Sequence, residues 1–468
     1  MNDAGGIFLS YYGDDFSGST DVMESLTRAG MRTILFLEPP SREQLRRFRG
    51  IRAFGVAGLS RSMPTAQMDK DLAGVFAGLR KSGAAIVHYK VCSTFDSSPH
   101  TGSIGRAIDI GQSIFASPFV PLVVGVPVLG RYCVFGNLFA RSGPESSVFR
   151  LDRHPTMRQH PVTPMDESDL QLHLSRQTPT AIGLMDVLQL SGAGEEIDIR
   201  LAALLESGPK TVLFDVLGEE HLRAIGRLIW LQAKRTPPLF VAGSSGIEYA
   251  LTAYMGAARL LPSAPVFAGA AKVEQAVVIS GSCSPVTERQ IAWSLNQAHE
   301  GFCEITVDTM RLVDSGQAAA EIGAVAERAL NAIAGGRSII IHTGRGPGDA
   351  RIEATLDRVR PSCAGNAEVK FQTGKMLGTA LGRILRSVLE KTDIRRAAVA
   401  GGDTSGHVAR EIGIEALEMI APLAPGGPLC RAYAGKAGAS GVEGLEIVFK
   451  GGQVGKEDFF DSLLAGSP

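Results

Sequence analysis

Short apolar runs alternate with segments of helical periodicity along most of the chain. Apolar runs of about four to eight residues between turn signals are typical of buried strands, whereas apolar positions spaced three and four apart indicate helices. This alternation predicts an α/β fold with mostly parallel sheets. The expected strands are 7–12, 32–37, 53–59, 85–89, 211–216 and 238–242 in the first half, and 276–280, 303–307, 338–342, 397–400 and 445–449 in the second.

The helix after the first strand is expected to begin near Asp21, because Glu24 three residues later completes a capping-box pattern. Gly30 would end it. The strand at 32–37 would then close one βαβ unit. The interval from about 110 to 165 is rich in proline, glycine, arginine and histidine, which indicates irregular structure or an inserted β element.

The chain is long enough for two domains. Its 468 residues exceed the roughly 250–300 at which a single core stops growing. A segment with two prolines and several small residues around 261–267 predicts a boundary near 265, which gives domains 1–265 and 266–468. We expect two α/β domains that face an interdomain cleft, where small-molecule sites are common.

Charge and composition exclude several classes. The 47 basic and 48 acidic side chains nearly cancel, which argues against nucleic-acid binding. The longest apolar run, 119–129, is too short to span a bilayer and contains two prolines. The first residues lack the basic region of a signal peptide. Six cysteines without paired spacing favour a reduced, cytoplasmic protein, and no metal-ligand pattern is visible.

The first motif with chemical potential, GDDFSGSTD, spans 13–21 and follows the first predicted strand. In open α/β sheets, ligands bind outside the carboxyl ends of strands. The adjacent carboxylates of Asp14 and Asp15 could accept hydrogen bonds from a polyol, take a proton from a hydroxyl, or hold Mg²⁺ through water. The alternative is a helix N-terminus rich in Asp and Ser for capping alone.

A second motif, YKVCSTFDSS at 89–98, also follows a predicted strand. Lys90 among several hydroxyls suits a carboxylate or phosphate anion. Solvated turn residues are the alternative. Cys92 is interpreted as a buried or neutral thiol and not a nucleophile, because no histidine partner can be argued for it.

The third motif, AGGDTSGH at 400–407, lies between an apolar run and a helix. Glycines let backbone N–H groups approach a phosphate, and a helix N-terminus favours its charge. Neither a Walker A motif nor GxGxxG occurs, and a tight turn is the alternative. Similar glycine-bearing turns follow predicted strands at 280–285, 344–348 and 450–455. Together they indicate a nucleotide site.

These motifs resemble, in order and over nearly the whole chain, those of the four-carbon acid-sugar kinase family. The matching segments are DDFSGSTD at 14–21, Arg61 in SRS, KVCSTFDS at 90–97, GR and GNLF at 130–139, HPVTPM at 160–165, SGSCSP at 280–285, GGDTSG at 401–406 and KGGQVG at 450–455. Two segments depart from the family. Residues 98–105 read SPHTGSIG instead of continuing toward GNIG, and KGGQVG replaces KxGNFG.

The resemblance implies an N-terminal sugar-binding domain and a C-terminal nucleotide-binding domain. It implies an ATP-dependent kinase, using Mg²⁺, that phosphorylates the terminal hydroxyl of a small acid sugar such as 3-oxo-isoapionate or 3-oxo-tetronate. Asp14 and Asp15 would orient the sugar hydroxyls, one of them as general base. The other implied substrate ligands are Ser17, Arg61, Lys90 and Ser93. The implied ATP ligands are Ser280, Ser282, Gly344, Gly401, Gly402, Asp403, Thr404 and Gly451.

Two other functions remain open from the sequence. A non-catalytic sensor of sugar or nucleotide could keep this fold, although a sugar sensor would not need the C-terminal glycine loops. A nicotinamide-dependent dehydrogenase ranks last, because the GxGxxG fingerprint is missing. The sequence predicts an acid sugar and ATP as partners, with neither nucleic acid nor membrane, and leaves open whether the chain forms a homo-oligomer.

Overall fold

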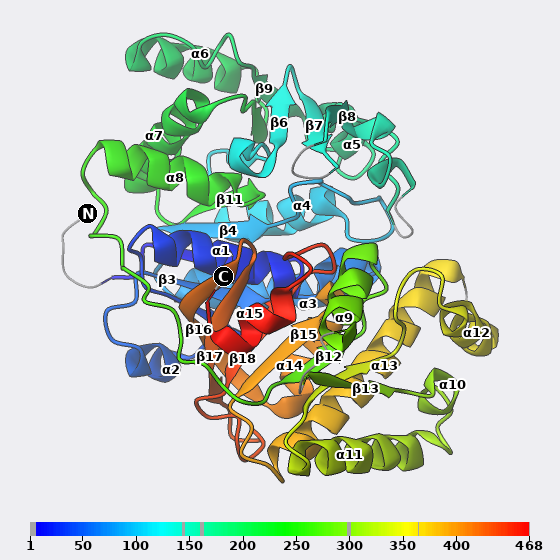
Figure 1. The fold of residues 1–468 in the computed structure, drawn as a ribbon. Coiled ribbons are helices and arrows are strands. Elements are labelled where there is room, and N and C mark those ends of the chain that lie inside the picture. Colours follow the sequence, from blue (N-terminus) through cyan, green and yellow to red (C-terminus); the bar gives the residue numbers. More distant parts are fainter. Residues whose placement is uncertain (1–5, 143–145, 160–162, 297–300, 364, 468) are drawn as a thin grey trace. The chain divides into compact units, whose positions relative to one another are not determined.

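A computed structural model describes residues 6–142, 146–159, 163–296, 301–363 and 365–467 (Figure 1). The first half of the HPVTPM segment, residues 160–162, lies outside the described residues. Contacts divide the chain into two compact units. The N-terminal unit comprises residues 1–14, 25–33 and 39–265, and the C-terminal unit comprises residues 15–24, 34–38 and 266–468.

The N-terminal unit is built on a parallel sheet with the strand order β3-β1-β4-β11-β5-β10-β9. These strands are β1 (Leu9–Gly13), β3 (Ala53–Ala57), β4 (Ile86–Lys90), β5 (Val120–Val123), β9 (Ile182–Met185), β10 (Thr211–Phe214) and β11 (Leu239–Gly243). A small antiparallel sheet of β6 (Arg131–Val134), β7 (Asn137–Arg141) and β8 (Val148–Arg150) is inserted after β5.

Helices connect these strands, and apolar spacing explains how they pack. In α3 (Thr65–Lys81) the buried residues Met68, Leu72, Phe76 and Leu79 recur at intervals of three and four, which places them on one face. Helices α7 (Glu219–Arg235) and α8 (Gly246–Ala257) pack side by side (Figure 1). The remaining helices here are α2 (Arg42–Arg47), α4 (Ile104–Phe115), α5 (Leu170–Ser175) and α6 (Gly194–Glu206).

The C-terminal unit has the strand order β13-β14-β12-β15-β18-β17-β16-β2. Strands β13, β14, β12, β15 and β18 are parallel to one another. Beyond β18, the pairs β18–β17, β17–β16 and β16–β2 are antiparallel. The strands are β2 (Thr33–Phe36), β12 (Val277–Ser280), β13 (Phe302–Thr306), β14 (Ser338–His342), β15 (Arg396–Ala400), β16 (Ile414–Ala424), β17 (Gly427–Ala434) and β18 (Glu446–Lys450). The helices are α9 (Pro285–Asn296), α10 (Thr309–Leu312), α11 (Ala318–Ala334), α12 (Ala350–Val359), α13 (Asn366–Leu389), α14 (Gly402–Ile412) and α15 (Phe459–Ala465).

The predicted α/β fold with mostly parallel sheets is confirmed, and every expected strand lies within two residues of an observed one. The inserted β element is confirmed as β6–β8. Two local predictions are wrong: α1 (Phe16–Arg28) begins five residues before Asp21, and β2 pairs antiparallel with β16 instead of closing a βαβ unit with β1. The interdomain cleft and the functional division at 265 stay predictions. Among the described residues, we find no helix with the length and hydropathy to cross a membrane.

Candidate active site

Three predicted substrate ligands meet at the carboxyl ends of neighbouring strands β3, β1 and β4. Asp14 follows β1, Lys90 ends β4, and Arg61 lies in a short 3₁₀ helix (Ser60–Ser62) after β3. The Arg61 guanidinium donates from Nε to Asp14 Oδ2 at 3.1 Å and from Nη2 to Asp14 Oδ1 at 2.8 Å. Asp14 N donates to Lys90 O at 2.8 Å, and Arg61 N donates to Asp14 O at 3.0 Å. The three residues therefore form one fixed cluster.

Lys90 is the unpaired cation of this cluster. Its side chain is buried, with 3% of the residue exposed, and no described residue accepts a hydrogen bond from its ammonium or forms an ion pair with it. A buried charge without a partner is unfavourable unless a counter-charge is supplied. The neighbouring Tyr89 hydroxyl lies 3.2 Å from Ser60 Oγ, and burial together with Asp14 raises the pKa of Tyr89. Lys90 thus suits an anionic ligand.

The loop after Lys90 is held by its own hydroxyls and by α5. Thr94 Oγ1 donates to Asp96 Oδ1 at 2.6 Å, and Ser97 Oγ lies 2.8 Å from His173 Nε2 on α5. Burial lowers the pKa of His173 to about 4, so the imidazole is neutral at pH 7. Ser93 lies in the partly exposed turn of this loop.

The same loop contains the Cys92 thiol and contacts Gln177, which follows α5. Burial raises the pKa of the Cys92 thiol, which agrees with the predicted neutral thiol. Gln177 Nε2 donates to Ser97 Oγ at 2.9 Å. Sequence reasoning missed both His173 and Gln177, because a lone histidine and glutamine about 80 residues from the loop carry no motif.

The predicted nucleotide ligands gather at the carboxyl ends of the adjacent strands β14, β12, β15 and β18. Gly281 N donates to Ala400 O at 3.0 Å, and Gly401 N donates to Lys450 O at 2.9 Å. Gly401 has φ +121, a conformation that side chains disfavour, and α14 begins at the next residue. The helix N-terminus and the glycine turns therefore form a cradle suited to phosphate. Its predicted members are Ser280, Ser282, Gly344, Gly401, Gly402, Asp403, Thr404 and Gly451.

Asp15 and Ser17 lie beside this cradle. A Cβ atom placed on Gly402 would be 3.5 Å from both Asp15 Oδ2 and Ser17 Oγ, and one on Gly451 would be 3.8 Å from Ser17 Oγ. The Ser17 hydroxyl is buried and has no hydrogen-bond partner among the described residues. The two adjacent carboxylates thus differ: Asp14 is clamped by Arg61, whereas Asp15 faces the nucleotide loops.

The turn after β14 is fixed by charged residues that sequence reasoning missed. Asp349 Oδ2 accepts from Arg345 N at 2.9 Å and from Arg351 Nη2 at 2.6 Å. Hydrogen bonding to Arg351 holds the pKa of Asp349 well below its usual range. His342 Nε2 lies 2.9 Å from Glu304 Oε1, and burial lowers the pKa of His342. These contacts set the position of Gly344, but no sequence motif marks them.

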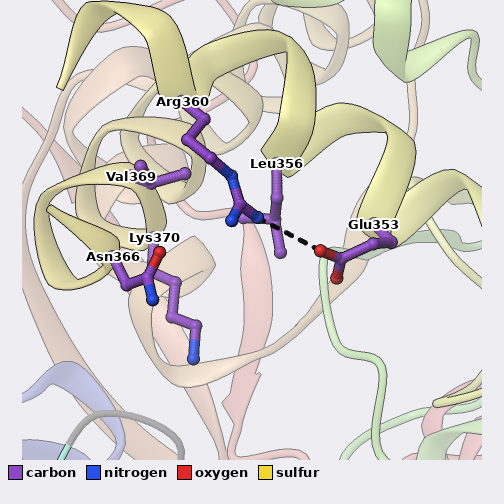
Figure 2. Close-up of a pocket in the computed structure, with 6 residues that line it drawn as sticks. All are labelled: Glu353, Leu356, Arg360, Asn366, Val369 and Lys370. Carbon is purple, nitrogen blue, oxygen red and sulfur yellow. Dashed lines mark hydrogen bonds and ion pairs between the residues drawn. The ribbon is translucent and has the colours of Figure 1, made fainter.

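A separate hollow of about 250 Å³ lies by α12 and α13 (Figure 2). Arg360 Nη2 donates across it to Glu353 Oε1 at 3.2 Å. Its lining residues are Glu353, Leu356, Arg360, Asn366, Val369 and Lys370. None of the predicted site residues lines this hollow, so it is distinct from the loops described above.

Comparison with known families agrees with this division of the loops. Residues 9–251 match a sugar-binding N-terminal domain family, and residues 277–460 match a nucleotide-binding C-terminal domain family. The chain belongs to the four-carbon acid-sugar kinase family. The predicted sugar kinase is thereby confirmed.

Individual relatives are similar to this acid-sugar kinase over nearly the whole chain. A protein of Paraburkholderia graminis named 3-oxo-isoapionate kinase is 47% identical, over 98% of this chain and 95% of the relative. A 3-oxo-tetronate kinase of Methylobacterium radiotolerans is 32% identical, over 97% and 98%. A solved structure from Salmonella typhimurium LT2, described as a putative tRNA synthase, has 27% identity and a TM-score of 0.72, over 97% and 98%.

Proposed function

We propose that this kinase transfers the γ-phosphoryl group of ATP to the terminal hydroxyl of 3-oxo-isoapionate. The choice of substrate is supported by the 47% identity to the 3-oxo-isoapionate kinase over 98% of the chain, compared with 32% identity to a 3-oxo-tetronate kinase. The buried, unpaired ammonium of Lys90 supports an anionic substrate, since it lacks the counter-charge that a sugar carboxylate would supply.

The proposed roles follow from the surroundings of each residue. Lys90 and Arg61 would bind the carboxylate end of the sugar, and Asp14, Ser17 and Ser93 would orient its hydroxyls. Asp15, beside Gly402, would accept the proton of the attacking hydroxyl as its oxygen bonds to the γ-phosphorus and the bond to ADP breaks. Phosphoryl transfer depends on such positioning and on charge stabilisation more than on covalent help from the protein.

The glycine loops of the C-terminal unit would hold ATP through backbone N–H groups. Mg²⁺ would accompany the nucleotide and neutralise charge on its phosphates. The described residues include no group of three or more His, Cys, Asp or Glu side chains placed to hold a metal. This fits Mg²⁺, which commonly keeps several waters and binds through phosphates with one or two carboxylates. Asp403, in the first turn of α14, is the carboxylate we expect nearest to it.

The test is Mg²⁺- and ATP-dependent release of ADP with 3-oxo-isoapionate, 3-oxo-tetronate and the parent acid sugars. We expect the highest kcat/KM with 3-oxo-isoapionate and only background release without sugar. A higher kcat/KM with 3-oxo-tetronate would contradict the assignment of 3-oxo-isoapionate as the substrate, but it would still show kinase activity. Sugar and ATP binding without ADP release would instead identify a sensor.

Gly102 offers a test of the Arg61 position. Gly102 has φ +59, and a Cβ atom there would lie 2.3 Å from the carbonyl oxygen of Arg61. Gly102→Ala is therefore expected to displace Arg61 and to raise the sugar KM by about tenfold or more. Gly83 is the matched control, because it has φ +79 but no atom of a described residue lies within 4 Å of the added atom.

Gly83→Ala should cost only the backbone strain, about 1 kcal/mol of unfolding free energy, and leave the KM unchanged. Steady-state kinetics and denaturant unfolding of both variants make the comparison. An equal KM in the two variants would show that the contact with Arg61 does not set the sugar site.

A further inference from the structure

Lys450 is a completely buried lysine beneath the nucleotide loops. It ends β18, and none of its surface is exposed. Its Nζ atom donates to Thr287 Oγ1 at 3.3 Å and lies 5.6 Å from the centre of the Phe459 ring. The described residues give this ammonium no other hydrogen bond and no ion pair. A three-donor cation is thus held in the interior by one hydroxyl and one aromatic face.

No charged side chain of the described residues forms an ion pair with Lys450. The described elements around it carry these charged and titratable side chains: Asp15, Asp21, Glu24 and Arg28 at α1, Glu288 and Arg289 on α9, Asp403, His407, Arg410 and Glu411 on α14, Arg396 on β15, Cys430, Arg431 and Tyr433 on β17, Glu446 on β18 and Asp461 on α15. None of them forms an ion pair with Lys450, and burial alone lowers the pKa of Lys450 to about 7. The side chain therefore changes protonation within the physiological range.

One hydroxyl separates this ammonium from the loops. Thr287 Oγ1, its partner, also lies 3.1 Å from Ser282 Oγ and donates to Gly452 O at 3.0 Å. The carbonyl of Lys450 accepts from Gly401 N at 2.9 Å. Lys450 is consequently joined to the turns after β12, β15 and β18, which hold the predicted ATP ligands.

We propose that Lys450 is a positioning residue that compensates the charge of the nucleotide phosphates through Thr287, and that it takes up a proton when ATP binds. This inference rests on the proposed nucleotide site. Charges inside a protein are weakly screened, so phosphates brought to the loops favour the ammonium over the neutral amine. Above pH 7 the unliganded protein therefore keeps Lys450 mostly as the neutral amine, and ATP binding converts it to the ammonium.

The test is calorimetric titration with MgATP in buffers of different ionisation enthalpy, which counts the protons taken up on binding. At pH 8 we expect the wild-type protein to take up nearly one proton more than Lys450→Met, and at pH 6 only about a tenth of one more. Proton changes of the nucleotide itself are common to both proteins and cancel. The wild-type Kd for ATP should weaken as pH rises above 7, by up to about tenfold per unit, whereas that of Lys450→Met should not.

Lys450→Arg is the second variant, because a guanidinium keeps its proton. When Lys450→Arg binds ATP, it should take up the same number of protons as Lys450→Met. Lys450→Met should also melt at a higher temperature than wild type at pH 6, where most of the wild-type molecules carry the buried charge. At pH 8, a proton count in either variant equal to that of wild type would overturn the role of Lys450. Absence of ATP binding to wild type would instead overturn the nucleotide site, and the inference with it.

Discussion

Replacing Asp15 with asparagine is expected to lower kcat by about 10²–10⁴-fold, the range typical for loss of a general acid or base. The amide has the shape of the carboxylate but cannot accept the proton of the attacking hydroxyl. Asp15 Oδ2 lies 3.5 Å from the position of a Cβ atom on Gly402, which puts this oxygen at the loop where the phosphates are expected. The KM for ATP should change little, since the glycine loops are intact. Single-turnover ADP release measures the chemical step directly.

Asp14→Asn is the matched control, because it makes the same chemical change at the adjacent residue. Asp14 is clamped by Arg61 through both carboxylate oxygens, so we expect its loss mainly to raise the sugar KM. Asp15 Oδ1 also accepts from Gly18 N at 2.8 Å at the start of α1, and asparagine can keep that contact. If Asp14→Asn lost kcat and Asp15→Asn lost only affinity, the two roles would be exchanged.

Much of the fold could be predicted because the buried parallel strands are local features. The run 338–342, for example, is short, mostly apolar and bounded by turn residues, and it forms strand β14. The start of α1 could not be predicted, since the capping pattern at Asp21 was an equally good local signal. Long-range packing favours the earlier start of α1, because the centres of the Phe16 and Phe449 rings lie 4.5 Å apart although the residues are more than 400 positions apart in the chain.

The same long-range packing explains the pairing of β2. Its residues pair antiparallel with β16, and on α1 Glu24 accepts a hydrogen bond from Gly426 N at 2.9 Å. The hairpin of β16 and β17 was not expected at all. Nothing near residues 15–38 in the sequence indicates these partners, because they lie almost 400 positions later.

For the site, sequence motifs indicated the residues but not their environments. The motif at 13–21 gave two equivalent carboxylates, whereas the structure separates Asp14, beside Arg61, from Asp15, beside the nucleotide loops. The motif KGGQVG places Lys450 at the start of a glycine turn but does not indicate that its side chain is buried. The Lys450 ammonium contacts Thr287 and Phe459, which come from two different helices. Such environments arise only when the strands are assembled.

Replacing Arg61 with methionine is expected to cost both stability and activity. The Asp14 side chain is 5% exposed, so removal of the guanidinium leaves a buried carboxylate without its bidentate partner. Breaking a buried ion pair from one side costs about 3–5 kcal/mol, and we expect the lower end because the Arg61 side chain is 24% exposed. Loss of a charge contact to the sugar should lower kcat/KM by about 10²–10³-fold. Denaturant unfolding and ADP-release kinetics report the two effects.

The double variant Arg61→Met/Asp14→Asn separates the two effects. Replacing the Asp14 carboxylate with a neutral amide should bring the unfolding free energy to within about 1 kcal/mol of wild type, because the buried charge that lost its Arg61 partner is gone. The activity should stay low, because neither the guanidinium nor the hydroxyl-orienting carboxylate is present. A double variant as unstable as Arg61→Met would show that Arg61 stabilises the loops through packing. Recovery of kcat/KM together with stability would show that neither Arg61 nor Asp14 contacts the sugar, and that the loss in Arg61→Met comes from the uncompensated charge of Asp14.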